Sequence, residues 1–196
     1  MSISCILFDL GNVLLLHKTQ QRLHALSVVC DRSEDDVRSF LIHSEIIDQL
    51  DLGHAQATDL ATKLSELAGK EISPEQAITL WLKVFEPNRW LWKNLQRLAS
   101  HFSLGIFSNN PPFVVRLFPR DMNFTYVFLS SQFGAMKPDI AVFKAVQASL
   151  SWAPDQILFI DDKPENIYQA RSIGWNALQF KNNKQLDQDL IRLGLW

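Results

Sequence analysis

Apolar residues follow two patterns along this chain. Five short runs are almost wholly apolar and end in polar or turn-forming residues, which is typical of strands covered on both faces. These runs are residues 4–8, 104–108, 126–130, 157–161 and 176–180. Segments with a helical pattern are residues 92–101, 113–118, 140–150, 166–173 and 184–193. Strands that alternate with helices predict an α/β fold built on an open parallel sheet.

The stretch from about residue 19 to residue 87 departs from this alternation because it has no strand pattern. Ser33 stands before three acidic residues, which is typical of a helix start, and Ser73 precedes a proline and another acid. Gly53 and Gly69 stand where glycines commonly end helices. We therefore predict an α/β core of residues 1–17 and 88–196, with an inserted helical cap of residues 18–87.

Composition favours a protein with a sizeable core and argues against several classes. The chain has 196 residues, of which 47% are hydrophobic, and a net charge of −2. It has no basic run that would favour nucleic acid and no apolar stretch of the roughly 18 residues that a membrane helix needs. The first residues do not resemble a signal peptide, so we expect a cytoplasmic protein. Cys5 and Cys30 are too isolated for a disulfide framework or a zinc site, and we expect both in the core.

Polar residues that carry chemistry follow four of the predicted strands. Asp9 comes after the first, Ser108 and Asn109 end the second, Lys137 opens a helix after the third, and Asp161-Asp162 end the fourth. In an open parallel sheet, ligands bind in the crevice beyond the carboxyl ends of the strands. We therefore expect these residues to converge on one edge of the sheet, although each alone is also consistent with a turn or a helix start.

The chemistry of these residues is complementary. Asp9 and Asp162 are the oxygen ligands that Mg²⁺ favours. Lys137 supplies a positive charge and Ser108 a donor for phosphate oxygens. An aspartate close to both a metal and a phosphate can attack the phosphorus and form an aspartyl phosphate. The set predicts phosphoryl transfer, which depends mainly on positioning and on charge neutralisation.

Four segments, "FDLGNVLL", "FSNN", "GAMKPD" and "FIDDKPEN", resemble the four sequential motifs of the haloacid dehalogenase-like (HAD) superfamily. The sequences of these segments are most similar to those of sugar phosphatases of the α-D-glucose-1-phosphate phosphatase type. The resemblance implies a Rossmann-like core with a helical cap. It also implies a Mg²⁺-dependent phosphatase acting on a small phosphorylated metabolite.

The resemblance assigns a metal site to the first and fourth motifs. It implies that Asp9 is both the nucleophile and a Mg²⁺ ligand, that Gly11 contributes its backbone carbonyl, and that Asp162 is the distal ligand. Asp161 would support the metal from beside it or through water. Asn166 would contact the metal's waters, with a helix N-cap as its alternative role.

The second and third motifs correspond to phosphate recognition in the same resemblance. Ser108 and Asn109 would bind the phosphoryl group, and Lys137 would neutralise its charge next to Asp9. The expected partner is therefore a small phosphorylated molecule, not nucleic acid or a membrane; the oligomeric state is left open.

Gly11 departs from the pattern of most phosphatases of this superfamily, which carry a second Asp there as general acid and base. The sugar-1-phosphatase relatives also have glycine at this position. His17 is the nearest residue that titrates near neutrality, so it is a candidate acid/base, with packing at the junction of core and cap as its alternative role. The missing acid also leaves two other functions open. One is a non-catalytic HAD-like binding or regulatory protein, and the other is a 2-haloacid dehalogenase.

Overall fold

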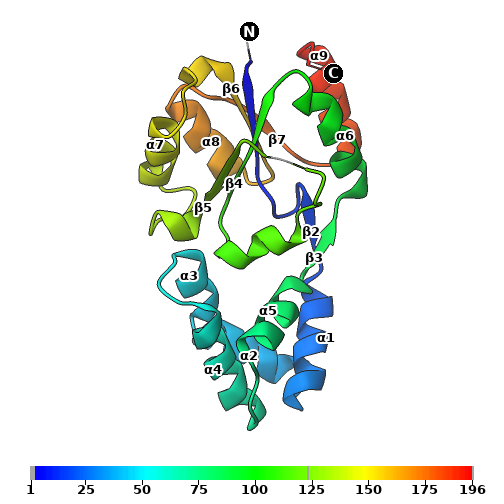
Figure 1. Cartoon of the computed structure of the whole chain (residues 1–196), viewed down its shortest axis with the longest axis vertical. Coiled ribbons are helices and arrows are strands. Elements are labelled where there is room, and N and C mark those ends of the chain that lie inside the picture. The colour runs from blue at the N-terminus through cyan, green and yellow to red at the C-terminus, as the bar shows by residue number, and fades with distance from the viewer. Residues whose placement is uncertain (1–2, 123, 196) are drawn as a thin grey trace.

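The computed structural model describes residues 3–122 and 124–195. The chain forms a sheet-containing lobe and a helical lobe, and both termini lie at the end of the sheet lobe away from the helical one (Figure 1). A five-stranded parallel sheet has the order β5-β4-β1-β6-β7. Its strands are β1 (Cys5–Phe8), β4 (Ser103–Ser108), β5 (Tyr126–Leu129), β6 (Ile157–Asp161) and β7 (Asn176–Gln179). The α/β fold with a parallel sheet is confirmed.

The register of the central strands explains why the polar residues meet. Phe8, the last residue of β1, lies beside Ile106 of β4 and Ile160 of β6. One residue further along, the chain reaches Asp9 directly after β1 and Asp161 at the end of β6. Neighbouring strands that pair in parallel therefore bring their last residues to the same edge of the sheet.

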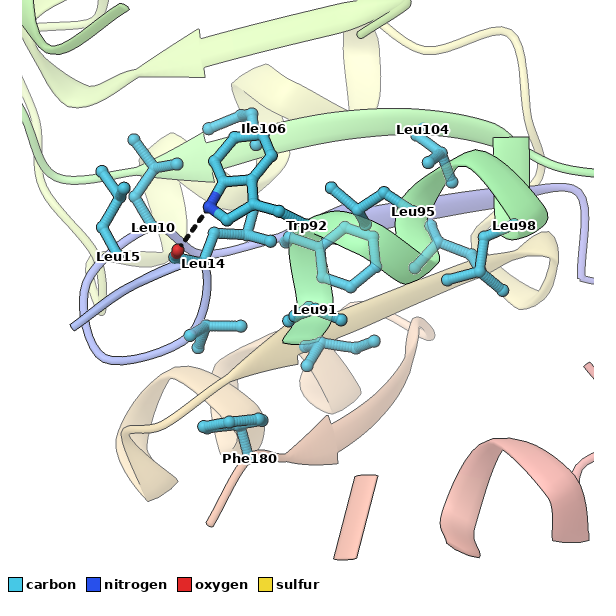
Figure 2. Close-up of a cluster of buried hydrophobic side chains, with 14 of the residues drawn as sticks. Leu10, Leu14, Leu15, Leu91, Trp92, Leu95, Leu98, Leu104, Ile106 and Phe180 are labelled. Atoms are coloured by element: carbon cyan, nitrogen blue, oxygen red, sulfur yellow. Dashed lines mark hydrogen bonds between the residues drawn. The ribbon is translucent and has the colours of Figure 1, made fainter. Parts of the chain in front are cut away.

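Helices cover both faces of the sheet, as its wholly buried strands require. On one face, Ile6 and Phe8 belong to a cluster that includes leucines of α6 (Arg89–Ala99) and α9 (Asn183–Arg192). Figure 2 shows this cluster, in which the Trp92 indole N–H donates to the carbonyl of Leu14 at 2.7 Å.

The other face of the sheet packs on α7 (Ile140–Ala148) and α8 (Pro164–Ser172). Cys5 and Leu7 lie in this second cluster, because successive residues of a strand point to opposite faces. Cys5 and Cys30 are both free and buried, as predicted.

Five helices form the helical lobe around a core of their own. They are α1 (Thr19–Cys30), α2 (Glu34–His43), α3 (Ile46–Asp51), α4 (Ala57–Ala68) and α5 (Pro74–Leu82). Ser33 and Ser73 cap α2 and α5 as predicted, each accepting a hydrogen bond from the third backbone N–H of its helix. Gly69 ends α4 in the left-handed conformation, with φ of 65°. Within the described residues, no helix is long and apolar enough to cross a membrane.

Two details of the sequence prediction are wrong. Residues 19–87 were expected to hold no strand, but β3 (Phe85–Pro87) pairs antiparallel with β2 (Leu15–His17) where the chain passes between the lobes. A three-residue strand whose partner lies far away in sequence leaves no local pattern. Segment 113–118 forms the 3₁₀ helix η1 (Pro112–Leu117), and two further short 3₁₀ helices are η2 (Ser130–Gln132) and η3 (Pro154–Gln156).

Candidate active site

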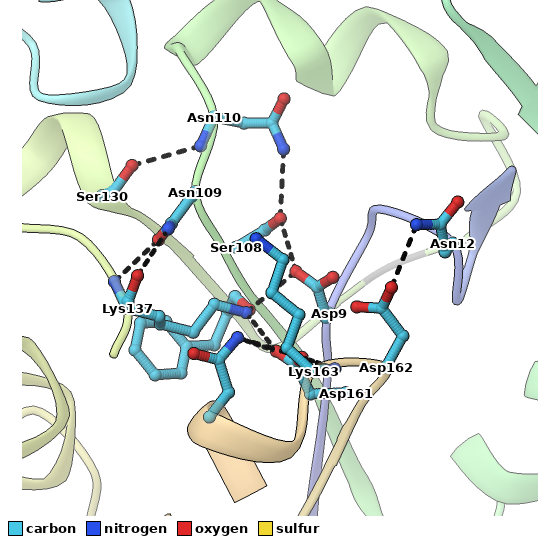
Figure 3. Close-up of polar contacts among 12 residues, drawn as sticks. Asp9, Asn12, Ser108, Asn109, Asn110, Ser130, Lys137, Asp161, Asp162 and Lys163 are labelled. Atoms are coloured by element: carbon cyan, nitrogen blue, oxygen red, sulfur yellow. Dashed lines mark hydrogen bonds and ion pairs between the residues drawn. The ribbon is translucent and has the colours of Figure 1, made fainter. Parts of the chain in front are cut away.

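A pocket lies at the carboxyl edge of the sheet, against the helical lobe. Its sheet side contains most of the residues that sequence motifs singled out, and its other side is formed by residues of α1, α3 and α5. Figure 3 shows the polar residues of the sheet side, which come from segments far apart in the sequence and point toward one another. The predicted convergence of the strand ends is therefore what the structure displays.

Lys137 is the centre of this arrangement. Its ammonium group lies 2.9 Å from Asp9 Oδ1, 2.6 Å from Asp161 Oδ2 and 2.8 Å from the carbonyl oxygen of Phe107. The side chain is only 2% exposed. Burial alone would lower the pKa of Lys137, but the carboxylates of Asp9 and Asp161 outweigh it, and the net pKa is raised. One fixed positive charge therefore stands between two buried acids.

Asp9 uses one of its oxygens for all its contacts with side chains. Oδ1 accepts from Ser108 Oγ at 2.8 Å as well as from Lys137. Figure 3 shows its other oxygen on the side of Asp162. Burial raises the pKa of Asp9 to about 6, although Lys137 opposes the shift. Asp9 thus has one oxygen held by donors and one directed toward the fourth strand end.

Asp161 and Asp162 are adjacent in sequence but have different surroundings. Asp161 is fully buried and accepts from Lys137, from the backbone N–H of Lys163 and, with both oxygens, from Asn166 Nδ2. Asp162 is partly exposed and accepts from Asn12 Nδ2 at 3.0 Å. The chain's own donors therefore occupy Asp161, while one oxygen of Asp162 is left facing Asp9 (Figure 3).

These acids meet the requirements of a metal site. Asp9, Asp161 and Asp162 each offer an oxygen, and the three oxygens lie within 4.8 Å of one another. Gly11 lines the same pocket. A hard cation such as Mg²⁺ takes one or two carboxylates and completes its shell with water and substrate oxygens. Because Asp161 is committed to Lys137 and Asn166, Asp9 and Asp162 are the acids of this cluster with oxygens left to hold Mg²⁺.

Asn166 lies in the first turn of α8 and not at its N-cap, which is Lys163, so the N-cap alternative is wrong. Its amide donates to both carboxylate oxygens of Asp161, one of which Lys137 also contacts. Asn12 is a residue that the sequence analysis missed. Its φ of 55° places it in the left-handed region that asparagine tolerates, and its amide orients Asp162. An asparagine directly after a glycine was the available signal.

Ser108 and Asn109 have separate surroundings. The Ser108 hydroxyl accepts from Asn110 Nδ2 at 3.1 Å and donates to Asp9. The Asn109 side chain donates to the backbone carbonyl of Lys137 and accepts from its N–H, both at 2.9 Å. Asn109 therefore fixes the backbone that carries Lys137.

His17 occupies space beside Gly11. A β-carbon added at Gly11 would lie 2.8 Å from His17 Nε2, so the imidazole stands where a side chain at residue 11 would otherwise extend. Partial burial and the nearby positive charge of Arg22 lower the pKa of His17. The neutral imidazole is the favoured form at neutral pH.

A parallel sheet with an inserted helical lobe, and strand ends that gather a buried Asp–Lys–Asp network, define the class of protein. The chain has the fold of haloacid dehalogenase-like (HAD) hydrolases of known structure, in agreement with the resemblance of its four motifs. No protein-family model matches the chain.

Comparisons with individual proteins agree with this class. A D-ribitol-5-phosphate phosphatase from Bacteroides thetaiotaomicron is 24% identical over 197 residues, covering 94% of this chain and 95% of that protein. The structure of a predicted HAD-like family hydrolase from Porphyromonas gingivalis is 25% identical, with a TM-score of 0.82 and 98% of both chains covered. A HAD family enzyme from B. thetaiotaomicron, in complex with magnesium and inorganic phosphate, is 20% identical with a TM-score of 0.82, covering 94% of this chain and 98% of that one. A 2-haloacid dehalogenase from Pseudomonas syringae is less similar in structure, with a TM-score of 0.62 at 20% identity over 97% of this chain and 99% of that one.

Proposed function

We propose that this phosphoric monoester hydrolase is a Mg²⁺-dependent phosphatase that acts through an aspartyl phosphate on Asp9. One observation carries the proposal. Asp9 is buried at a strand end with one oxygen held by Ser108 and Lys137, and its other oxygen on the side of Asp162. A nucleophile must be held at the reacting atom in this way, because phosphoryl transfer depends on alignment and on charge neutralisation.

In the first step, a carboxylate oxygen of Asp9 attacks the phosphorus in line, and the leaving oxygen departs with the electrons of its bond to phosphorus and takes a proton from water. The Lys137 ammonium group and the Ser108 hydroxyl hold Asp9 and offset the charge of the phosphoryl oxygens. Asn109 and Asp161 keep Lys137 in place, through its backbone and its ammonium group respectively. Mg²⁺ at Asp9, Asp162 and the Gly11 carbonyl would neutralise the phosphoryl charge.

In the second step, water attacks the phosphorus of the aspartyl phosphate, the bond to the Asp9 oxygen breaks, and inorganic phosphate leaves. We assign the proton of this water to His17. Its imidazole takes the space beside Gly11, and its lowered pKa keeps it able to accept a proton. General base assistance of this kind contributes about 10²–10⁴-fold. Replacing His17 with Gln is expected to slow the second step, so that phosphoenzyme accumulates in a rapid-quench experiment. Unchanged turnover would remove this role.

The substrate proposed is a small sugar or polyol phosphate. The relative that spans nearly the whole chain is named as a phosphatase of D-ribitol 5-phosphate, which supports this class. The glucose-1-phosphate type has no separate support. The dehalogenase alternative is not favoured. The three aspartates that could hold a metal ion suit a metal-bound phosphate better than a haloacid anion.

The test is phosphate release from a panel of phosphorylated metabolites, with Mg²⁺ or with EDTA, for the wild type and for Asp9→Asn. Turnover that needs both Mg²⁺ and the Asp9 carboxylate is expected. A folded protein that binds Mg²⁺ but releases no phosphate from any substrate would contradict the proposal and favour the non-catalytic binding function.

A further inference from the structure

The helical side of the pocket carries three polar side chains from three different helices. Arg22 lies on α1, Asp51 ends α3 and Trp81 lies on α5. All three line the pocket that contains Asp9. They stand across from the strand ends, where the part of a substrate beyond its phosphate would lie.

Each of these side chains holds a buried polar atom that lacks a hydrogen-bond partner. The atoms are Arg22 Nε, Asp51 Oδ1 and Trp81 Nε1, and Asn166 Oδ1 is a fourth on the sheet side of the same pocket. Within residues 3–122 and 124–195, six buried side-chain atoms lack a partner, and these four of them belong to residues that line this pocket. Native proteins pair nearly all buried polar groups, so a cluster of unpaired ones at one pocket indicates a ligand that pairs them.

The three side chains are held in position before any ligand arrives. The Arg22 guanidinium lies over the Trp81 ring at 5.1 Å, and the ring of Phe113 meets Trp81 edge-on at 6.3 Å. Trp81 is only 5% exposed. The backbone carbonyl of Asp51 accepts from Ser130 Oγ, which ties the end of α3 to the sheet lobe.

The chemistry of the cluster indicates the kind of group it binds. Trp81 Nε1 and Arg22 Nε are donors and Asp51 Oδ1 is an acceptor, while Ile47 and Val84 provide apolar surface in the same pocket. Donors and an acceptor beside apolar surface suit a carbon chain bearing hydroxyl groups, since a hydroxyl both donates and accepts. Burial raises the pKa of Asp51 to about 8, so this carboxyl is largely neutral at neutral pH and does not repel a phosphorylated substrate.

We propose that Arg22, Asp51 and Trp81 form a specificity site that binds the hydroxyl groups of a sugar or polyol monophosphate while its phosphate lies at Asp9. This inference rests on the proposed function and deepens it. A site built to pair substrate hydroxyls discriminates strongly against analogues without them, because the site's own polar groups are then left unpaired.

The test compares polyol phosphates of three to six carbons with p-nitrophenyl phosphate, which carries no hydroxyl. The variants are Trp81→Phe, which removes the N–H and keeps an aromatic ring, and Asp51→Ala. We expect each to lower the ratio of kcat/KM for the best polyol phosphate to that for p-nitrophenyl phosphate by about 10- to 100-fold. Trp152→Phe is the matched control, since Trp152 also has a buried unpaired N–H but does not line the pocket. Its ratio is expected to equal that of the wild type.

A binding measurement separates this inference from the proposed function. In the Asp9→Asn background, calorimetry gives the Kd of the same polyol phosphates without turnover, and adding Trp81→Phe is expected to weaken binding by about 10-fold or more. A ratio and a Kd that both stay at their starting values would overturn the specificity site while leaving the phosphatase intact. Polyol phosphates that bind no more tightly than inorganic phosphate would overturn it as well. Selective, tight binding by a wild type that never releases phosphate would instead support the site and contradict the catalytic proposal.

Discussion

Replacing Lys137 with Met tests whether one charge holds the strand ends together. The change keeps an unbranched side chain over the rings of Phe107 and Phe159. The centroids of these rings lie 5.1 and 5.0 Å from the ammonium nitrogen of Lys137. It removes three hydrogen bonds and leaves the acids of Asp9 and Asp161 facing each other without a cation. Removing one partner of a buried ion pair costs about 3–5 kcal/mol. For a chain of this size that corresponds to a fall in Tm of roughly 6–20 °C.

The assay is thermal unfolding followed by circular dichroism at pH 7.5 and pH 5, without added metal. The pKa of Asp9 is already raised to about 6 with Lys137 in place, and removing the lysine raises it further. A carboxyl whose folded pKa is raised favours the folded state below its unfolded pKa and loses that contribution as the pH rises through the folded value. The stability deficit of Lys137→Met should therefore be smaller at pH 5 than at pH 7.5.

Lys163→Met is the control for this experiment. Lys163 stands at the same strand end but is exposed, so its loss is expected to cost less than about 0.5 kcal/mol. A Tm of Lys137→Met within a degree of the wild type would refute the charge argument. An equal deficit at both pH values would show that lost packing, not charge, is the cause.

Three further predictions follow from particular contacts. Asp51→Asn should raise stability more at pH 9 than at pH 5, measured by the urea midpoint, because the pKa of Asp51 is raised to about 8 and its favourable contribution is lost as the pH rises through that value. Gly53→Ala should open the two lobes and increase the radius of gyration in small-angle scattering, since the added β-carbon would lie 2.2 Å from the carbonyl oxygen of Ser131. Gly69→Ala, with a similar φ and no atom within 4 Å of its β-carbon, should leave the radius unchanged. Asn12→Ala should raise the Mg²⁺ concentration needed for half-maximal activity by about 10–100-fold, because it removes the amide that orients a metal-site carboxylate.

The positions of site residues could be predicted from the sequence where they follow directly from the topology of a parallel sheet. Asp9 and Lys137 could be placed at one edge because parallel strands must deliver their ends there, whatever the packing details. The resemblance gave Asp161 and Asp162 different roles, but the contact of Asp161 with Lys137 was not accessible, since successive side chains of a strand point in opposite directions and only the fold decides which meets Lys137. β3 was missed because its pairing partner is distant in sequence.

The helical side of the pocket was the least predictable part. Arg22 and Asp51 lie on helices whose local sequence carries no sign of a binding site. They reach the pocket because the helical lobe stands over the strand ends, and no local pattern encodes that placement.

The contact between Ser130 and the end of α3 has a consequence for the timing of turnover. Ser130 Oγ donates to the backbone carbonyl of Asp51 and accepts from the backbone N–H of Asn110, two residues beyond Ser108. The loop beside the nucleophile and the helical lobe thus share one hydroxyl. By linkage, any ligand that stabilises this loop favours the state in which the helical lobe is docked on the sheet lobe. Docking raises the affinity for that ligand by the same factor. We expect bound product phosphate to delay undocking, which would make release the slow step at saturating substrate and make the rate sensitive to solvent viscosity.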